Sequence, residues 1–184
     1  MTPKPGRLVA VVGPSGVGKD SVMDACAAAD PNIVLARRVI TRPSEAGGEA
    51  FDGVSEAEFE TRRAAGDFVL SWPAHGLQYG VPRAIATDLA AGRTVLVNLS
   101  RQVLLQAQTA FAGLQVISLT APPEVLATRL AARGRESGDD IQRRLSRGAL
   151  ALPEGLHHVN EIENAGPLED TVAAVLAALQ PESV

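Results

Sequence analysis

The segment from Gly13 to Lys19 combines the residue types and the spacing that bind phosphate. It reads Gly13-Pro14-Ser15-Gly16-Val17-Gly18-Lys19, with four residues between the first glycine and the Gly-Lys pair. Glycines let the backbone curl so that several N–H groups point at one anion, and the lysine reaches the β- and γ-phosphates of a nucleotide. An apolar run precedes the segment and a helix-forming stretch follows it, as this motif requires. The pattern favours an ATP-binding phosphotransferase over a simple glycine-rich turn.

Asp20 departs from the usual form of the motif. The residue after the lysine is normally Ser or Thr, whose hydroxyl binds Mg²⁺, but here Asp20 stands there and Ser21 follows. Phosphates repel a carboxylate unless Mg²⁺ lies between them, and Asp is a good oxygen ligand for this ion. Two interpretations stay open: Asp20 binds Mg²⁺ directly or through water, or it interacts with the positive end of the following helix.

Candidate residues for a second, phosphorylated substrate lie further along the chain. Arg42 is flanked by Thr41 and Pro43, and its guanidinium suits bidentate contact with phosphate. Arg101 follows an apolar stretch that ends at Asn98, and Ser100 precedes it. The alternatives are a solvated loop for Arg42 and an exposed first helical turn for Arg101.

The only Tyr, the only Trp and one His cluster within eight residues. The Tyr79 hydroxyl is a candidate donor to an acceptor phosphate, with packing in a hairpin as the alternative. Phosphoryl transfer depends on positioning and charge more than on a strong base. We therefore interpret His75 as a pocket or turn residue and Trp72 as a packing residue that could also shape the pocket.

The elements that must position these residues alternate between strand and helix. Such alternation predicts a parallel sheet with right-handed crossovers, whose ligands bind beyond the carboxyl ends of the strands. A hairpin is expected at His75-Gly76, and Ser55 with Glu58 forms a capping box. The predicted strands are 8–12, 33–40, 94–99, 114–119 and 157–162, and the predicted helices are 20–29, 83–91, 101–111, 123–132, 140–151 and 168–179.

Composition limits the classes of function. The 184-residue chain is 46% hydrophobic and carries a net charge of −4, which argues against a duplex nucleic-acid ligand. A single cysteine, Cys26, excludes an intrachain disulfide, and no segment resembles a membrane span or a secretory leader. We expect a cytoplasmic protein that acts on small molecules and binds neither nucleic acid nor membrane.

Beyond the phosphate loop, the chain resembles guanylate kinases over nearly its whole length. The motifs shared with that family are Thr41-Arg42-Pro43, Gly48-Glu49, Val54-Ser55, Tyr79-Gly80, Gln102, Ala121-Pro122-Pro123, Arg129-Leu130, Arg133-Gly134 and Arg144-Leu145. The resemblance implies an α/β, three-layer P-loop kinase fold with a central parallel sheet. It also implies a core (1–36, 93–132 and 146–184), an acceptor-binding subdomain (about 37–92) and a lid (about 133–145).

The residues that read guanine are missing. Leu70 stands where those kinases carry a base-reading Glu, and Asn98 and Ser100 replace the carboxylates after the middle strand. Unmet polar edges of a base weaken recognition strongly. A closer resemblance is to ribose 1,5-bisphosphate phosphokinases, which share Gly18-Lys19-Asp20-Ser21, Ile40-Thr41-Arg42, Leu70-Ser71-Trp72, Ala74-His75-Gly76-Leu77, Ser100-Arg101 and Arg133-Gly134-Arg135-Glu136.

This second resemblance implies transfer of the ATP γ-phosphoryl group to ribose 1,5-bisphosphate, giving 5-phospho-α-D-ribose 1-diphosphate, with Mg²⁺ as cofactor and a monomer or homodimer as the working unit. Arg133, Arg135 and Arg144 are implied as lid residues over ATP, with Lys19, Arg133 and Arg144 as the catalytic set. Glu49 and Arg144 join the implied acceptor site. A nucleoside-monophosphate kinase is the first alternative. A non-catalytic binding module is the second, although such modules tend to lose the phosphate loop.

Five further positions receive an interpretation from the sequence. Arg129 is expected on a solvated helix face, and His157-His158 is expected to be structural because neighbouring strand residues face opposite sides. Asn164 and Gly166 precede the last predicted helix and are candidates for the adenine site.

Overall fold

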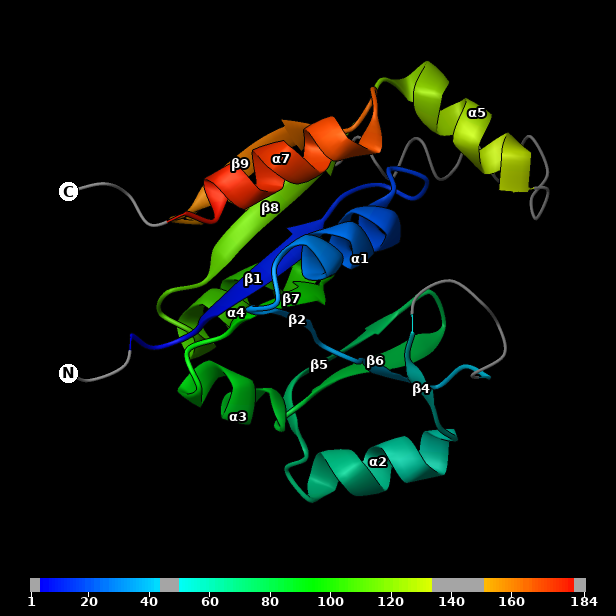
Figure 1. The fold of residues 1–184 in the computed structure, drawn as a ribbon. Coiled ribbons are helices and arrows are strands. Elements are labelled where there is room, and N and C mark those ends of the chain that lie inside the picture. Colours follow the sequence, from blue (N-terminus) through cyan, green and yellow to red (C-terminus); the bar gives the residue numbers. More distant parts are fainter. Residues whose placement is uncertain (1–3, 44–49, 134–150, 181–184) are drawn as a thin grey trace.

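The computed structural model describes residues 4–43, 50–133 and 151–180, and for Arg133 only the backbone. Its core is a five-stranded sheet in the order β2-β7-β1-β8-β9, in which every neighbouring pair is parallel (Figure 1). The strands are β1 (Arg7–Val12), β2 (Ile33–Leu35), β7 (Thr94–Asn98), β8 (Gln115–Thr120) and β9 (Val159–Glu163). The predicted α/β fold with a central parallel sheet is confirmed.

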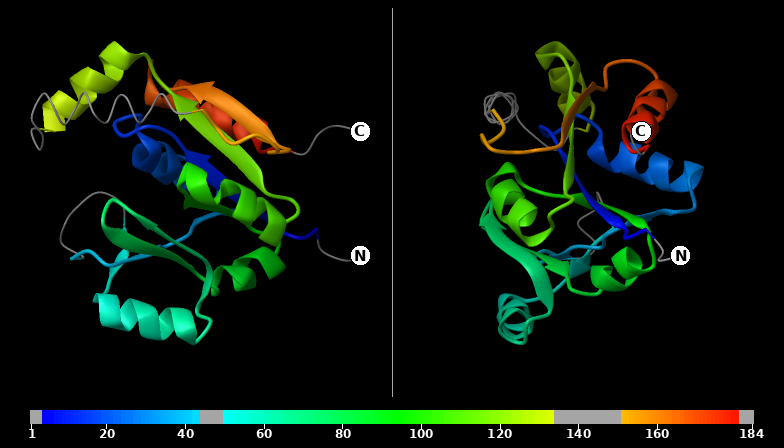
Figure 2. Two further views of the ribbon diagram at one scale, coloured as in Figure 1. Left: turned by 180° about the vertical axis from the view of Figure 1, so that it is seen from behind. Right: turned by 90° about the vertical axis from the view of Figure 1, so that its left-hand side faces the viewer.

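Helices cover both faces of this sheet because its central strand is apolar on both sides. Val9 and Val11 of β1 pack toward α1 (Lys19–Ala29) and α7 (Leu168–Ala178), which contact each other. Leu8, Ala10 and Val12 pack with Leu104 and other residues around α4 (Leu104–Ala110) on the opposite side (Figure 2). Alternate strand residues face opposite sides of a sheet, so an unbroken apolar run requires two covering layers.

The strand order brings three loops to one edge of the sheet. β1 lies between β7 and β8, and the loops that follow these strands begin at Gly13, Leu99 and Ala121. Parallel sheets bind ligands where neighbouring strands send their chains to opposite sides. The phosphate loop therefore occupies the expected position for a ligand site, between the loop after β7 and α5 (Pro123–Arg133), which follows β8.

A second, four-stranded sheet lies beside the first, in the order β4-β3-β6-β5 (Figure 1). It is built from β3 (Val39–Ile40), β4 (Asp52–Gly53), β5 (Phe68–Ala74) and β6 (Leu77–Pro82). β5 and β6 form the predicted hairpin, and its two-residue turn has positive φ at both His75 (53°) and Gly76 (73°). Two-residue turns of this handedness match the twist of paired strands.

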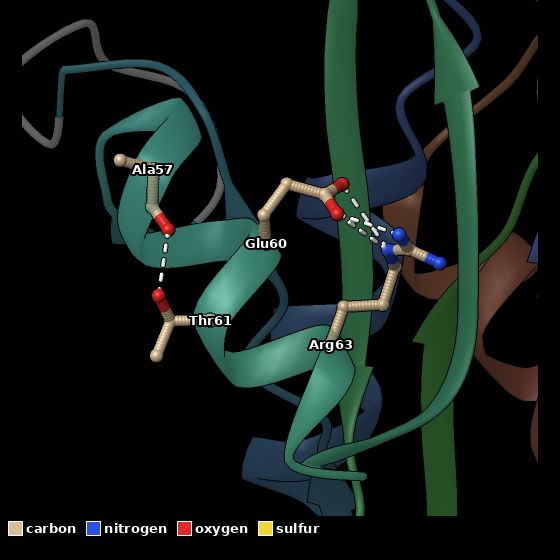
Figure 3. Close-up of polar contacts among 4 residues, drawn as sticks. All are labelled: Ala57, Glu60, Thr61 and Arg63. Atoms are coloured by element: carbon tan, nitrogen blue, oxygen red, sulfur yellow. Dashed lines mark hydrogen bonds and ion pairs between the residues drawn. The ribbon is translucent and has the colours of Figure 1, made fainter.

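Helix α2 (Glu56–Ala64) follows β4, has Ser55 as its N-cap and presents a polar face to solvent. The Ser55 hydroxyl accepts a hydrogen bond from the Glu58 backbone N–H at 3.1 Å, as the capping prediction requires. Arg63 pairs with Glu60 one turn away at 2.5 Å (Figure 3), and this hydrogen bond lowers the pKa of the Glu60 carboxyl. Both side chains are exposed, so the pair adds little stability.

The prediction of one strand over residues 33–40 is wrong. The segment forms two short strands in different sheets: β2 pairs with β7 in the core, and β3 pairs with β6 and β4. Arg37 and Arg38 lie between them, where the chain passes from one sheet to the other. An apolar run alone does not reveal which partner strand each half will meet.

The other predicted elements within the described residues are present with small shifts at their ends. α3 (Ile85–Ala90) lies within the predicted 83–91, and the predicted helix 101–111 begins as a 3₁₀ turn, Arg101–Val103, before α4. The predicted helix 140–151 falls almost entirely outside the described residues. No helix in the described ranges has the length and apolar character needed to cross a bilayer.

Candidate active site

The phosphate loop wraps between β1 and α1 with two glycines in the left-handed region. Gly16 and Gly18 have φ of 86° and 95°, a conformation that costs other residues free energy because of the Cβ atom. Lys19, the first residue of α1, folds back over the loop. Its ammonium donates to the carbonyl of Gly13 at 2.7 Å and lies 3.5 Å from that of Pro14. The loop and its lysine thus have the arrangement that cradles a nucleotide phosphate.

Two segments distant in sequence hold the loop from behind. The Asn164 side-chain amide donates to the Val17 carbonyl at 2.7 Å, and an Arg129 guanidinium N–H donates to the same oxygen at 3.1 Å. Arg129 also donates to the Asn164 carbonyl at 2.7 Å, and the Thr171 hydroxyl donates to the Asn164 side-chain oxygen at 2.6 Å. These four residues form one network that fixes the loop's shape, which we call the loop brace.

The loop brace corrects the interpretation of Arg129. The expected solvated helix face is wrong: Arg129 is half-buried, and its guanidinium contacts the phosphate loop and Asn164. The helical spacing of arginines in the sequence does not reveal that the side of α5 that carries Arg129 faces the phosphate loop. Asn164 is buried. In the sequence it stands out only as one amide side chain shortly before a predicted helix, which does not indicate a contact with the phosphate loop.

A cavity of about 630 Å³ opens in front of the phosphate loop, toward the second sheet. Four cations line it: Lys19 from the first sheet's edge, Arg38 and Arg42 from the chain around β3, and Arg101 from the loop after β7. No Asp or Glu is among the described residues of its wall. The remaining lining residues are Val12, Gly13, Pro14, Ser15, Trp72, Ala74, His75, Leu77, Tyr79, Asn98, Leu99, Ser100 and Gln102.

The structure therefore brings together most of the residues singled out from the sequence. Arg42 lies with its guanidinium 4.3 Å from the centre of the Phe51 ring, a cation–π distance. Tyr79 stacks on Trp72 with ring centres 5.5 Å apart, and both residues line the cavity, so packing in the hairpin does not remove Tyr79 from the pocket. The role of its hydroxyl as a donor to an acceptor phosphate stays a prediction. His75 is exposed at the hairpin turn and also lines the cavity.

Asn98, Ser100 and Arg101 follow from the end of β7. β7 pairs with β1 in register, Asn98 opposite Val11, so this strand ends level with the start of the phosphate loop. Partial burial lowers the pKa of the Arg101 guanidinium. A cation held away from bulk water attracts an anionic ligand more strongly than an exposed one does.

Three wall residues were missed or undervalued from the sequence. The sequence indicates no role for Arg38, because this residue lies inside an apolar run that is typical of one continuous strand, yet it lines the cavity. Gln102 appeared only as part of the resemblance, and its amide donates to the Pro73 carbonyl at 2.6 Å, which ties the hairpin to the loop after β7. The sequence favours packing for Trp72, with a place in the pocket as a further possibility, and the structure shows that Trp72 forms part of the wall.

Other predicted residues lie beside the cavity or outside the described ranges. Asp20 and Ser21 are in the first turn of α1 and are not part of the cavity wall. Gly16, Val17 and Gly18 shape the loop from behind it. Among the described residues no group of three or more His, Cys, Asp or Glu side chains is placed to hold a metal ion. Glu49, Arg135, Arg144 and the side chain of Arg133 are outside the described part of the chain.

Comparison with known proteins agrees with this geometry. None of the protein-family models searched matches the chain. The chain is 55% identical over 181 residues to the ribose 1,5-bisphosphate phosphokinase PhnN of Ruegeria sp. (strain TM1040), covering 98% of this chain and 95% of that protein. It is 47% identical over 176 residues to the enzyme of the same name from Agrobacterium fabrum, covering 94% and 96%.

The chain belongs to the ribose 1,5-bisphosphate phosphokinase family. Among solved structures, guanylate kinase from Anaplasma phagocytophilum has a similar fold, with a TM-score of 0.67, 18% identity and coverage of 98% of this chain and 90% of that one. This likeness shows the fold alone. This chain thus has a P-loop kinase fold of the guanylate-kinase type, as the sequence resemblance implied.

Replacing Asn164 by Ala should weaken ATP binding about tenfold. The change removes the amide that bonds to Val17 and leaves the Thr171 hydroxyl without its acceptor. Loss of one partner in a buried hydrogen bond costs about 1–3 kcal/mol. The dissociation constant of ATP, measured by calorimetry, and the melting temperature test the expectation. Asn160→Ala is the matched control, since Asn160 is an exposed residue of β9 that bonds only to Gln115 among the contacts described. An unchanged ATP affinity in Asn164→Ala would show that the loop keeps its shape without the brace.

Proposed function

We propose that this protein transfers the γ-phosphoryl group of ATP to ribose 1,5-bisphosphate, giving 5-phospho-α-D-ribose 1-diphosphate and ADP. The observation that carries the proposal is the cavity wall, where one phosphate loop with Lys19 faces Arg42 and Arg101 across a space of about 630 Å³. The phosphates of ATP would bind at the phosphate loop and Lys19, and the two phosphates of the acceptor would bind at the arginines on the opposite wall. The names of the curated relatives support the same activity.

The chemistry of the wall favours a sugar phosphate over a nucleobase. Leu70 is buried in a hydrophobic cluster that joins residues of both sheets, and Asn98 and Ser100 offer amide and hydroxyl groups to the cavity. A guanine site needs acceptors for the N1 and N2 hydrogens, and carboxylates meet that need best. The described wall has four cations and no carboxylate, which suits ribose hydroxyls and phosphates.

In this proposal the reaction is a single displacement at phosphorus. An oxygen of the acceptor's 1-phosphate forms a bond to the γ-phosphorus, while the bond from that phosphorus to the β,γ-bridging oxygen breaks and ADP leaves. The loop N–H groups and Lys19 hold the β- and γ-phosphates. Arg42 and Tyr79 hold the acceptor from the second sheet, and Asn98, Ser100, Arg101 and His75 line its other side.

Mg²⁺ is proposed to accompany ATP, where it offsets the charge of the phosphates. Asp20 would hold it, directly or through water, because it is the carboxylate nearest in sequence to Lys19 and lies at the start of α1. Asp20 also interacts electrostatically with Arg38 and raises the pKa of that guanidinium, which supports a position of the carboxylate within range of the cavity's cations. The alternative, an acid at the helix N-terminus alone, predicts no effect on metal dependence.

The division into a core (1–36, 93–132 and 146–184), an acceptor-binding subdomain (about 37–92) and a lid (about 133–145) remains part of the proposal. Within it, Arg133, Arg135 and Arg144 close over ATP and Glu49 contacts the acceptor or the hydration shell of the metal. Exclusion of water by such closure limits hydrolysis of ATP. The proposed working unit is a monomer or homodimer in the cytoplasm.

³¹P NMR of the purified protein tests the function. The protein is incubated with ATP, Mg²⁺ and either ribose 1,5-bisphosphate or GMP. We expect new diphosphate resonances and ADP in the first tube, and no change in GMP in the second. Conversion of GMP to GDP, with the sugar phosphate unchanged, would make the protein a divergent nucleoside-monophosphate kinase. Binding of neither ATP nor ADP would favour a non-catalytic module.

The same assay tests the metal role of Asp20. With Asp20→Asn, the concentration of Mg²⁺ needed for half-maximal rate should rise if the carboxylate binds the ion or its water. An unchanged Mg²⁺ dependence in the variant would leave only the interaction with the helix terminus.

A further inference from the structure

Two adjacent arginines between β2 and β3 have opposite environments. Arg37 is exposed, and its guanidinium has partners at the surface: it pairs with Asp52 at 2.5 Å and donates to the Phe51 carbonyl at 3.1 Å. Arg38 is 7% exposed and lines the cavity. Arginine is almost never buried to this degree without a specific reason, because burial removes the water that solvates its charge.

Aromatic rings hold the Arg38 guanidinium in the wall. It lies 5.0 Å from the centre of the Tyr79 ring, and the other neighbour of Tyr79 is Trp72, whose ring is stacked at 5.5 Å and 7°. Register explains the arrangement, since Val39, the residue after Arg38, pairs with Gly80 on β6, next to Tyr79. All three side chains of this stack line the cavity, so it forms one continuous surface facing the acceptor space.

The charge of Arg38 is maintained at a cost. The pKa of its guanidinium is lowered to about 10, mainly by burial; the charge of the neighbouring Arg42 acts in the same direction, while Tyr79 and Asp20 act against it. A pKa near 10 leaves the group protonated at neutral pH. Two guanidinium groups close enough to repel each other beside a phosphate loop are stabilised when an anion binds between them.

We propose that Arg38 is a substrate-binding residue that holds the acceptor's reacting phosphate beside Lys19. The proposal rests on the function proposed above and assigns this phosphate to the Arg38–Arg42 side of the cavity. The Tyr79–Trp72 stack fixes the planar guanidinium in orientation, which suits bidentate contact with a phosphate. Arg101, on the opposite side of the cavity, is then placed to bind the acceptor's other phosphate.

Three variants separate this role from packing. Arg38→Met keeps the length and the contact with Tyr79 but removes the charge, Arg38→Lys keeps the charge without the planar fork, and Arg37→Met is the matched surface control. For each we would measure kcat/KM with ribose 1,5-bisphosphate, the KM for ATP and the melting temperature. Binding of the acceptor without ATP is followed by fluorescence of Trp72, the only Trp in the chain.

Arg38→Met should lower kcat/KM for the acceptor about 30-fold, as expected for loss of a charge-assisted contact. The KM for ATP should stay within about twofold of the wild-type value, since the lost contact is with the acceptor and ATP binds at the phosphate loop. The melting temperature should be unchanged or higher because the variant no longer buries a charge. Arg38→Lys should recover part of the loss, and Arg37→Met should match the wild type.

The outcomes distinguish this inference from the proposed function. Equal acceptor kinetics and equal Trp72 titrations in Arg38→Met and Arg37→Met would overturn the role of Arg38 while leaving the function intact. A lower melting temperature with unchanged kcat/KM would reduce Arg38 to a packing residue. If the wild type does not phosphorylate ribose 1,5-bisphosphate, the proposed function fails. Titration of Trp72 fluorescence with inorganic phosphate then still decides whether Arg38 binds the anion, since Arg38→Met should lose that response.

Discussion

Lys19→Met should lower kcat by about 10³-fold, the loss found when a group that stabilises transition-state charge is removed. Lys19 starts α1 and lies over the phosphate loop, 2.7 Å from the Gly13 carbonyl, so its ammonium can follow the phosphoryl group during transfer. Met preserves the length of the side chain and its packing. Single-turnover kinetics with ATP and ribose 1,5-bisphosphate would measure the chemical step.

The chain provides an unusually clean control for this prediction. Its only other lysine is Lys4, which is exposed near the start of the chain. Lys4→Met should retain the wild-type rate, and both variants should melt at similar temperatures. A Lys19→Met enzyme with a rate near that of the wild type would contradict the assignment of the segment 13–19 as the catalytic phosphate loop.

Gly18→Ala should weaken ATP binding by roughly 10²-fold through two separate effects. Gly18 has φ of 95°, and the left-handed conformation costs an L-residue about 1–2 kcal/mol. A Cβ atom at this position would also lie 2.8 Å from the Asn164 side-chain nitrogen, too close for the bond from Asn164 to Val17 to survive unchanged. Calorimetric titration with ATP and Mg²⁺ would measure the loss.

Gly66→Ala is the control for Gly18→Ala, because it introduces backbone strain without a steric clash of the new Cβ atom. Gly66 has φ of 78°, but a Cβ there would meet nothing within 4 Å. This variant should lose about 1 kcal/mol of stability and keep its affinity for ATP. If Gly18→Ala and Gly66→Ala bound ATP equally well, the contact between Gly18 and Asn164 would have no bearing on the nucleotide site.

Much of the nucleotide side of the molecule follows from local sequence. The unbroken apolar run before Gly13 requires a strand buried on two faces, and the glycines with Lys19 require the turn and helix that the structure has. The hairpin at His75-Gly76 and the cap at Ser55 likewise depend on residues close together in the chain. Local chemistry fixes such features, so pattern reasoning finds them.

The parts that pattern reasoning missed depend on contacts between distant segments. Residues 33–40 divide between two sheets because the first half of the segment pairs with β7 and the second half pairs with β6, which no local pattern encodes. Arg38 acquires its place in the cavity only through that division. Arg129 and Asn164 are 35 residues apart and reach the phosphate loop from different elements, so their joint role appears only once β8 and β9 pair.

The loop brace makes the nucleotide site and α5 thermodynamically dependent on each other. One carbonyl, that of Val17, accepts hydrogen bonds from Arg129 of α5 and from Asn164 beyond β9. A shift of α5 must therefore carry the loop with it or sacrifice bonds worth about 1–3 kcal/mol when buried. By reciprocity, a nucleotide that holds the loop in one shape also favours one position of α5, and whatever favours that position raises nucleotide affinity by the same factor. This dependence extends along α5, which ends at Arg133.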